Sequence, residues 1–161
     1  MDKPSFRALS EDDLPMLHRW LRRPRVAEPS PLEEVLDEYL PTIDGRSTTK
    51  ACIASLHAQP IGFIQAYVVQ GSGNGWWEAE NGPGARGIDQ FLADAMLLNQ
   101  GLGTAMVTAF LEQLLEDPWV TRIQTDTFPS NRRAIRCYSK VSFKELGEIV
   151  TPDGPRNAYA L

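Results

Sequence analysis

Two glycines before an apolar stretch are the residues whose type and spacing point most directly to chemistry. Gly101 and Gly103 precede an amphipathic pattern of helical period, which we expect Pro118 to end. The first turn of a helix presents unpaired N–H groups and the positive end of the helix dipole, and glycine leaves that backbone open to a ligand. The stretch therefore predicts an anion-binding site at the helix N-terminus, called the anion seat below, with Thr104 in the opening turn of the helix. The alternative interpretation is a plain loop that joins a strand to a helix.

Composition and charge exclude several classes of protein. A chain of 161 residues with 42% hydrophobic and 23% charged residues is typical of a single globular domain, here residues 1–161. The net charge of −5 argues against nucleic acid as the main partner and is compatible with a cationic ligand. No apolar run is long enough to cross a membrane and no signal-peptide pattern is present, so we expect a cytoplasmic location. Two cysteines and two histidines without ligand spacing predict neither a disulfide framework nor a metal site.

Hydrophobic periodicity predicts an α/β protein with a mixed sheet. Helices are expected from the Ser10 cap to Pro24, over residues 32–40 with Pro41 as the stop, from Leu102 past Leu115, and over residues 131–140. Strands are expected over residues 5–9, 51–56, 61–69, 85–92, 121–127, 143–150 and 157–161. The resulting order is β-α-α-β-β-β-α-β-α-β-β, with no internal repeat.

Two motifs in this order resemble the GNAT superfamily of N-acetyltransferases. The glycine loop stands where that family seats the pyrophosphate of acetyl-CoA, although Leu98 replaces the usual Gln or Arg three residues before the first glycine. The segment from Asn131 to Phe143 is similar to the one in which Asn-x-x-Ala precedes Tyr-x-x-x-x-Phe. The resemblance implies a GNAT fold, with a mixed central sheet, splayed fourth and fifth strands and about four flanking helices.

A longer resemblance, over nearly the whole chain, is to the aminoglycoside 6'-N-acetyltransferases. It is carried by residues 71–78 (GSGNGWWE), 86–90 (RGIDQ), 123–126 (IQTD), 133–138 (RAIRCY) and 151–155 (TPDGP). It implies an enzyme that uses acetyl-CoA, and no metal, to acetylate the 6'-amino group of aminoglycoside antibiotics by direct transfer in a ternary complex, which gives resistance. The implied partner is a small cationic amine rather than nucleic acid or a membrane, and a monomer and a homodimer are both expected states.

The same resemblance suggests which residues act on the two substrates. Asp89 is expected to orient the amine and accept its proton, and Tyr138 to stabilise or protonate the departing thiolate. A polycationic sugar needs carboxylates for its ammonium groups and aromatic walls for its rings; the candidates are Trp76, Trp77, Glu78, Asp89, Asp126 and Asp153. The candidates for binding acetyl-CoA are Phe91, Leu92, Gln100, Gly101, Leu102, Gly103, Thr104, Asn131, Ala134 and Tyr138. Backbone N–H groups near Phe91 and Leu92 are expected to polarise the acetyl carbonyl.

Structural roles are the alternatives for these residues taken one at a time. A lone aspartate is a solvated loop acid, Tyr138 is a core aromatic of a short helix, and one or both of the tryptophans pack beneath the loop.

Three departures from the resemblance bear on the acceptor. Residues 26–31 are shorter than in such relatives and lack their Trp-Trp-Gly-Gly segment, Asn74 replaces a usual aspartate, and the sequence ends at Leu161, before a fuller last strand. The first two remove an aromatic wall and a negative charge from the acceptor side. The alternatives are therefore a GNAT enzyme for another amine, such as a polyamine, an amino sugar or a peptide N-terminus, and a non-catalytic module that binds the drug or an acyl-CoA.

Overall fold

The computed structural model describes residues 2–21, 32–70, 82–97, 100–151 and 154–160, which contain a seven-stranded sheet of order β1-β2-β3-β4-β5-β7-β6. The strands are β1 (Ser5–Ala8), β2 (Lys50–Leu56), β3 (Gln59–Val68), β4 (Ala85–Leu92), β5 (Arg122–Thr127), β6 (Lys144–Thr151) and β7 (Gly154–Ala160). The helices are α1 (Leu14–Leu21), α2 (Leu32–Asp44), α3 (Leu102–Leu114) and α4 (Arg132–Lys140), with 3-10 turns η1 (Glu11–Asp13) and η2 (Ala95–Leu97). Among these described strands only the β4–β5 pair is parallel, so the predicted mixed α/β sheet is confirmed.

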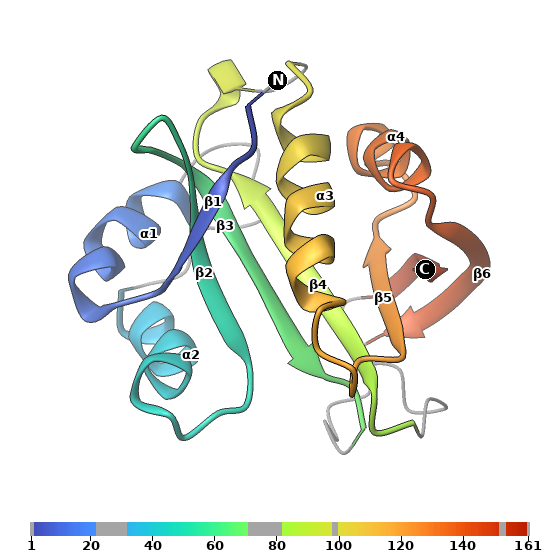
Figure 1. The fold of residues 1–161 in the computed structure, drawn as a ribbon, viewed down its shortest axis with the longest axis horizontal. Coiled ribbons are helices and arrows are strands. Elements are labelled where there is room, and N and C mark those ends of the chain that lie inside the picture. The colour runs from blue at the N-terminus through green and yellow to red at the C-terminus, as the bar shows by residue number, and fades with distance from the viewer. Residues whose placement is uncertain (1, 22–31, 71–81, 98–99, 152–153, 161) are drawn as a thin grey trace.

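Each face of the sheet is covered by its own pair of helices. Successive residues of a strand point to opposite faces, so one strand supplies two cores. Ile88, Met106 and Ile123 belong to a core between the sheet and the helices α3 and α4. Leu17 and Phe63 belong to a second core, beneath α1 and α2. In Figure 1, α3 crosses in front of the central strands.

The strands β4 and β5 run together for only part of their length. Their paired residues are Ala85 with Arg122, Arg86 with Ile123 and Gly87 with Gln124, after which the ladder stops while both strands continue. Figure 1 shows the two strands diverging toward the end of the sheet where α3 begins. On its other edge β5 pairs with β7. The predicted splay of the fourth and fifth strands is therefore confirmed.

Two expectations about helix ends are wrong. α2 continues through Pro41 to Asp44, because Leu40 and Ile43 pack against the core beneath α1 and α2, which outweighs the backbone hydrogen bond that proline lacks. α3 ends at Leu114, four residues before Pro118, and Leu115 is 50% exposed rather than part of the apolar stripe. Within the described part of the chain, no helix has the length and hydropathy needed to span a membrane.

Candidate functional site

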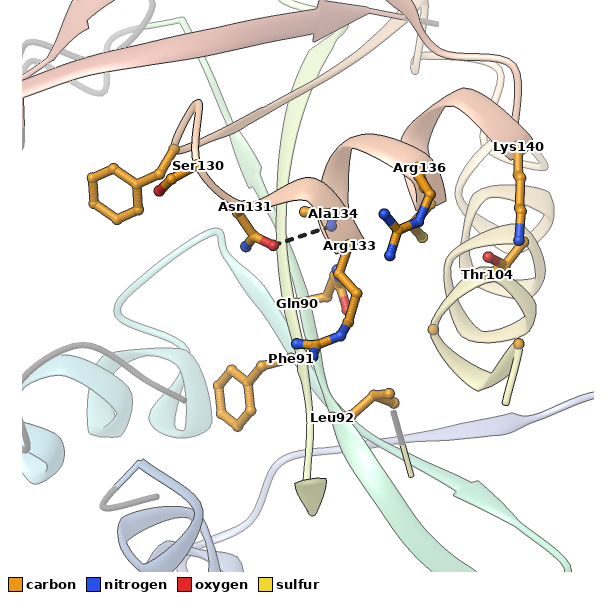
Figure 2. A pocket seen from close by; sticks show the side chains of 14 residues that line it. Gln90, Phe91, Leu92, Thr104, Ser130, Asn131, Arg133, Ala134, Arg136 and Lys140 are labelled. Carbon is orange, nitrogen blue, oxygen red and sulfur yellow. Dashed lines mark hydrogen bonds between the residues drawn. The ribbon is translucent and has the colours of Figure 1, made fainter. Parts of the chain in front are cut away.

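A cavity of about 540 Å³ lies where β4 and β5 have diverged, bounded by β4, α3 and α4 (Figure 2). It is lined by Gln90, Phe91, Leu92, Gly101, Gly103, Thr104, Phe128, Ser130, Asn131, Arg133, Ala134, Arg136, Cys137 and Lys140. Seven of the residues expected to bind acetyl-CoA are in this lining: Phe91, Leu92, Gly101, Gly103, Thr104, Asn131 and Ala134. The glycine loop and the Asn-x-x-Ala segment, which lie far apart in sequence, therefore form walls of the same cavity.

The cavity is suited to an anionic ligand. Gly101 caps the N-terminus of α3 with φ of 78°, a left-handed conformation that favours glycine, and the opening turn of the helix lies at the cavity wall. Arg133, Arg136 and Lys140 project from α4 on the cavity side (Figure 2). A helix N-terminus opposite three cations fits the phosphates of a coenzyme A derivative. The predicted anion seat thus has the charge and the backbone geometry that it needs.

Asn131 determines where α4 begins. Its side-chain oxygen accepts a hydrogen bond of 3.2 Å from the Ala134 backbone N–H, drawn in Figure 2, and this satisfies one of the donors at the helix start. The helix that begins at this cap carries Arg133, Arg136 and Lys140 in the cavity wall. Cys137 also lines the cavity, but burial raises the pKa of its thiol, so the thiol stays protonated and is a poor nucleophile.

Tyr138 is buried behind the cavity rather than in its wall. Its ring packs against Phe143 and Tyr159, with centroids 5.5 and 5.8 Å away. Burial raises the pKa of Tyr138 to about 12, against the opposing effect of hydrogen bonds with Thr125 and Gln90. The hydroxyl is therefore protonated at neutral pH and is connected to the cavity through Gln90, which lines it.

The opposite face of β4 is acidic. Asp89 directly precedes Gln90 on β4, so the two side chains point to opposite faces of the sheet. Asp89 lies directly across from Gln65 of β3, whose amide donates a hydrogen bond of 3.1 Å to its carboxylate. On the same face Tyr67 covers Gly87, where a Cβ atom would lie 2.0 Å from the tyrosine ring. Any side chain at Gly87 would displace Tyr67.

The Asp89 carboxylate is reachable by solvent yet enclosed by protein on several sides. Desolvation is the largest cause that raises its pKa, and the charge of Asp126 adds to it. The hydrogen bond from Gln65 and the charge of Arg156 act in the opposite direction. Glu38 of α2 is near enough that Asp89 contributes to the raised pKa of its carboxyl, after desolvation. Two carboxyl groups with raised pKa values thus face the same space, as expected for a site that removes a proton from a cation.

Asp126 is on the same face as Asp89 but is already paired. Its Oδ2 atom lies 2.8 Å from Nε of Arg156, and the two side chains are only 3% and 15% exposed. The guanidinium of Arg156 lies over the ring of Phe128, 3.7 Å from the ring centroid. Asp126 therefore differs from Asp89, since a half-buried cation from the same chain holds its carboxylate.

Comparisons with known proteins now identify the family. A model of the acetyltransferase (GNAT) domain matches residues 10–151. The aminoglycoside N(6')-acetyltransferase type 1 of Klebsiella pneumoniae is 48% identical over 162 residues, which covers 96% of this chain and 80% of that relative. This chain belongs to the aminoglycoside 6'-N-acetyltransferases of the GNAT family. The kanamycin resistance protein of Rhizobium radiobacter is 60% identical over 80 residues, half of this acetyltransferase and 74% of that relative.

Solved structures agree with the family. The aminoglycoside acetyltransferase AAC(6')-Ib in complex with coenzyme A and kanamycin is 46% identical, with a TM-score of 0.93 over 99% of this chain and 94% of that one. The same enzyme in complex with ribostamycin and coenzyme A gives the same identity and TM-score, over 99% and 93% of the two chains.

Several predicted site residues of the acetyltransferase lie elsewhere. Gln100 is exposed and its amide donates to the backbone carbonyl of Met96, while Leu102 is buried in the core beneath α3. Neither is part of the cavity lining. Trp76, Trp77, Glu78 and Asp153 lie outside the described residues, as do Asn74, Leu98 and residues 26–31. Among the residues described, no three His, Cys, Asp or Glu side chains are grouped so as to hold a metal ion.

Sequence reasoning missed part of both faces. On the acidic face it missed Gln65, Tyr67, Glu38 and Arg156, and in the cavity it missed the cations Arg133, Arg136 and Lys140. The alternation along β3 was a usable signal, because Gln65 and Tyr67 on one face contrast with the apolar Ile64 and Ala66 on the other. Nothing local marks Glu38 or Arg156, which reach the site only through the packing of α2 and the pairing of β7.

Proposed function

We propose that this protein transfers the acetyl group of acetyl-CoA to the 6'-amino group of aminoglycoside antibiotics and thereby gives resistance to them. The observation that carries the proposal is the opposite orientation of two neighbours on β4. Gln90 points into the cavity with the cationic wall, and Asp89 lies on the acidic face, at the place where β5 leaves β4. An anionic donor and a cationic acceptor can therefore approach the same gap from opposite sides of the sheet.

The acidic face supplies the base. An ammonium group becomes a nucleophile only after it loses a proton, and a carboxylate with a raised pKa is a better acceptor for that proton. Asp89 would take the proton directly or through water, with Gln65 holding the carboxylate and Glu38 contributing negative charge for the cation. The free amine then attacks the thioester carbonyl, the C–N bond forms and the C–S bond breaks. No enzyme nucleophile takes part, in keeping with the protonated thiol of Cys137.

The cationic cavity would hold the donor. The opening turn of α3 and the side chains of Arg133, Arg136 and Lys140 would bind the phosphates, while Phe91 and Leu92 of β4 would lie along the chain that carries the thioester. Tyr138 would give its proton to the thiolate that leaves. Its support is the hydrogen bond with Gln90, which lines the cavity, and a pKa raised to about 12, which keeps the proton on the hydroxyl at neutral pH.

The test is the release of CoA thiol from acetyl-CoA with kanamycin or tobramycin as acceptor, beside spermidine and glucosamine. Turnover that is selective for the two aminoglycosides is the expected result. NMR of the product should locate the added acetyl group at the 6'-amine. Turnover with spermidine or glucosamine alone would assign a different amine as substrate. Binding of acetyl-CoA without turnover of any acceptor would favour a binding module.

A monomer or a homodimer in the cytoplasm is the further expectation. Analytical ultracentrifugation measures the oligomeric state, and fractionation of expressing cells measures the location. A larger assembly, or recovery outside the cytoplasmic fraction, would contradict them.

A further inference from the structure

We propose that Arg156 is a specificity-determining residue: it occupies Asp126 in place of an ammonium group of the acceptor, and so favours 6'-amino sugars that present a neutral, hydroxyl-bearing group there. The inference rests on the proposed function, since it concerns the acceptor of that reaction. It goes further in naming which kind of 6'-amino compound the site selects.

The position of Arg156 follows from the sheet. Asp126 of β5 is paired with Ala158 of β7, and Arg156 is two residues from Ala158 on the same strand, so its side chain emerges on the same face as that of Asp126. The ion pair between Nε and Oδ2 is 2.8 Å long, and Asp126 is nearly fully enclosed. A carboxylate that is buried with a guanidinium at this distance is not available to a second cation without displacement of the first.

The guanidinium is also held from a second side. Its central carbon is 3.7 Å from the centroid of the Phe128 ring, a geometry that stabilises a cation on an aromatic face. Phe128 itself is part of the wall of the cofactor cavity. Movement of Arg156 away from Asp126 would therefore give up the aromatic contact and remove a cationic partner from a buried carboxylate.

The charges on the described part of the acidic face set what the acceptor must offer. Asp89 and Glu38 are exposed residues whose carboxylates have no cationic partner at ion-pair distance among the described residues, whereas the Asp126 carboxylate is enclosed and neutralised by Arg156. Asp89 and Glu38 attract the reacting amine and its neighbourhood. An additional ammonium group near Asp126 would meet the positive charge of Arg156, while a hydroxyl would meet no such repulsion.

The test compares two acceptors, methyl 6-amino-6-deoxyglucoside, with a single amine, and neamine, which carries several. In Arg156→Gln the side chain keeps hydrogen-bonding groups and loses the charge. We expect the ratio of kcat/KM for neamine to that for the single amine to rise about tenfold, mainly through a lower KM for neamine. Arg46→Gln is the matched control, because Arg46 makes the same Nε-to-Oδ2 pair, at 2.7 Å, with Asp44 on an exposed turn. The control is expected to leave the ratio as it is.

The double variant Asp126→Asn/Arg156→Gln should lose the gain, since no carboxylate remains for the added ammonium group. An equal change with both acceptors, or a lower ratio in Arg156→Gln, would overturn the inference. Should Arg156→Gln fail to fold, Arg156→Met, which keeps the packing on Phe128, carries the same expectation.

If the wild type turns over neither acceptor, the proposed function fails. Calorimetric titration of neamine into wild type and Arg156→Gln in the presence of CoA then decides the inference separately, and equal affinities would refute it.

Discussion

Gln65 and Asp89 face each other across the β3–β4 ladder, and the glutamine amide donates a 3.1 Å hydrogen bond to the carboxylate. The hydrogen bond favours the charged form of Asp89, while its enclosure by protein favours the neutral form. The balance leaves a carboxylate that is held in place and is more basic than one in water. Those are the two properties that a proton acceptor for an amine requires.

Removal of the Asp89 carboxylate should abolish most of the turnover. Asp89→Asn keeps the size of the side chain and its contact with Gln65, so we expect kcat to fall by about 10²–10⁴-fold without loss of folding. Thiol release measures the rate, and thermal denaturation verifies the fold. Glu38→Gln is the control on the same face, where the expected effect is on the KM for the acceptor. Near-normal turnover in Asp89→Asn would remove Asp89 from the catalytic role.

The pH profile should report on the groups around Asp89, which include Glu38 and Tyr39 on α2, Gln65 on β3, Asp126 on β5, Tyr138 on α4 and Arg156 on β7. Asp126 raises the pKa of Asp89, so Asp126→Asn should move the acid limb of kcat/KM to lower pH. Gln65 lowers that pKa, so Gln65→Leu should move the limb to higher pH. The acceptor amine also titrates, but its own pKa is the same whichever enzyme variant is measured, so it does not affect the comparison between variants. Shifts in the same direction for both variants would contradict Asp89 as the titrating base.

Tyr138→Phe separates a catalytic hydroxyl from a structural ring. The phenylalanine retains the packing on Phe143 and Tyr159 and loses only the proton and the hydrogen bonds to Thr125 and Gln90. We expect kcat to fall more than the affinity for acetyl-CoA, because the thiolate then leaves without its donor. Steady-state kinetics beside calorimetric binding of CoA provide the comparison. A lower melting temperature with unchanged kcat would instead assign Tyr138 to the core.

The glycine loop can be tested with two glycines of similar conformation. Gly101 and Gly45 have φ of 78° and 84°, so Gly101→Ala and Gly45→Ala should each cost about 1–2 kcal/mol of stability. A Cβ atom at Gly45 would have no neighbour within 4 Å, and Gly45 is not part of the cavity. Only Gly101→Ala should raise the KM for acetyl-CoA. Equal KM values in the two variants would argue against an anion seat at α3.

The cations of α4 should act through charge. Arg136→Gln removes one that lines the cavity, whereas Arg132→Gln removes an exposed one beside it that does not. We expect Arg136→Gln alone to raise the KM for acetyl-CoA by about fivefold to tenfold at low salt, and the difference to shrink as the ionic strength rises. Measurement at two salt concentrations checks both. The same KM in the two variants would indicate that the phosphates lie elsewhere.

Local patterns in the sequence were enough for the order of helices and strands and for the start of two helices. The glycine loop before α3 and the Asn131 cap of α4 act within a few residues of themselves, so their geometry is written in adjacent positions. Leu115 and Pro41 show the limit of such patterns. α2 is expected to stop at Pro41 and α3 to continue past Leu115, and both expectations are wrong. Contact with the core, which depends on distant residues, decides whether a helical turn is kept.

Membership of one cavity, or of one face, was decided only by the tertiary structure. Gln90 and Asp89 are neighbours in sequence, and the pleat of β4 sends one to the cationic cavity and the other to the acidic face. Asp126 and Arg156 are thirty residues apart, and they meet because β7 inserts between β5 and β6. The sequence by itself determined which carboxylates and cations the protein carries. Long-range strand pairing, which no local period encodes, determined that the Asp89 carboxylate lies opposite the neutral Gln65 whereas the Asp126 carboxylate is paired with the guanidinium of Arg156.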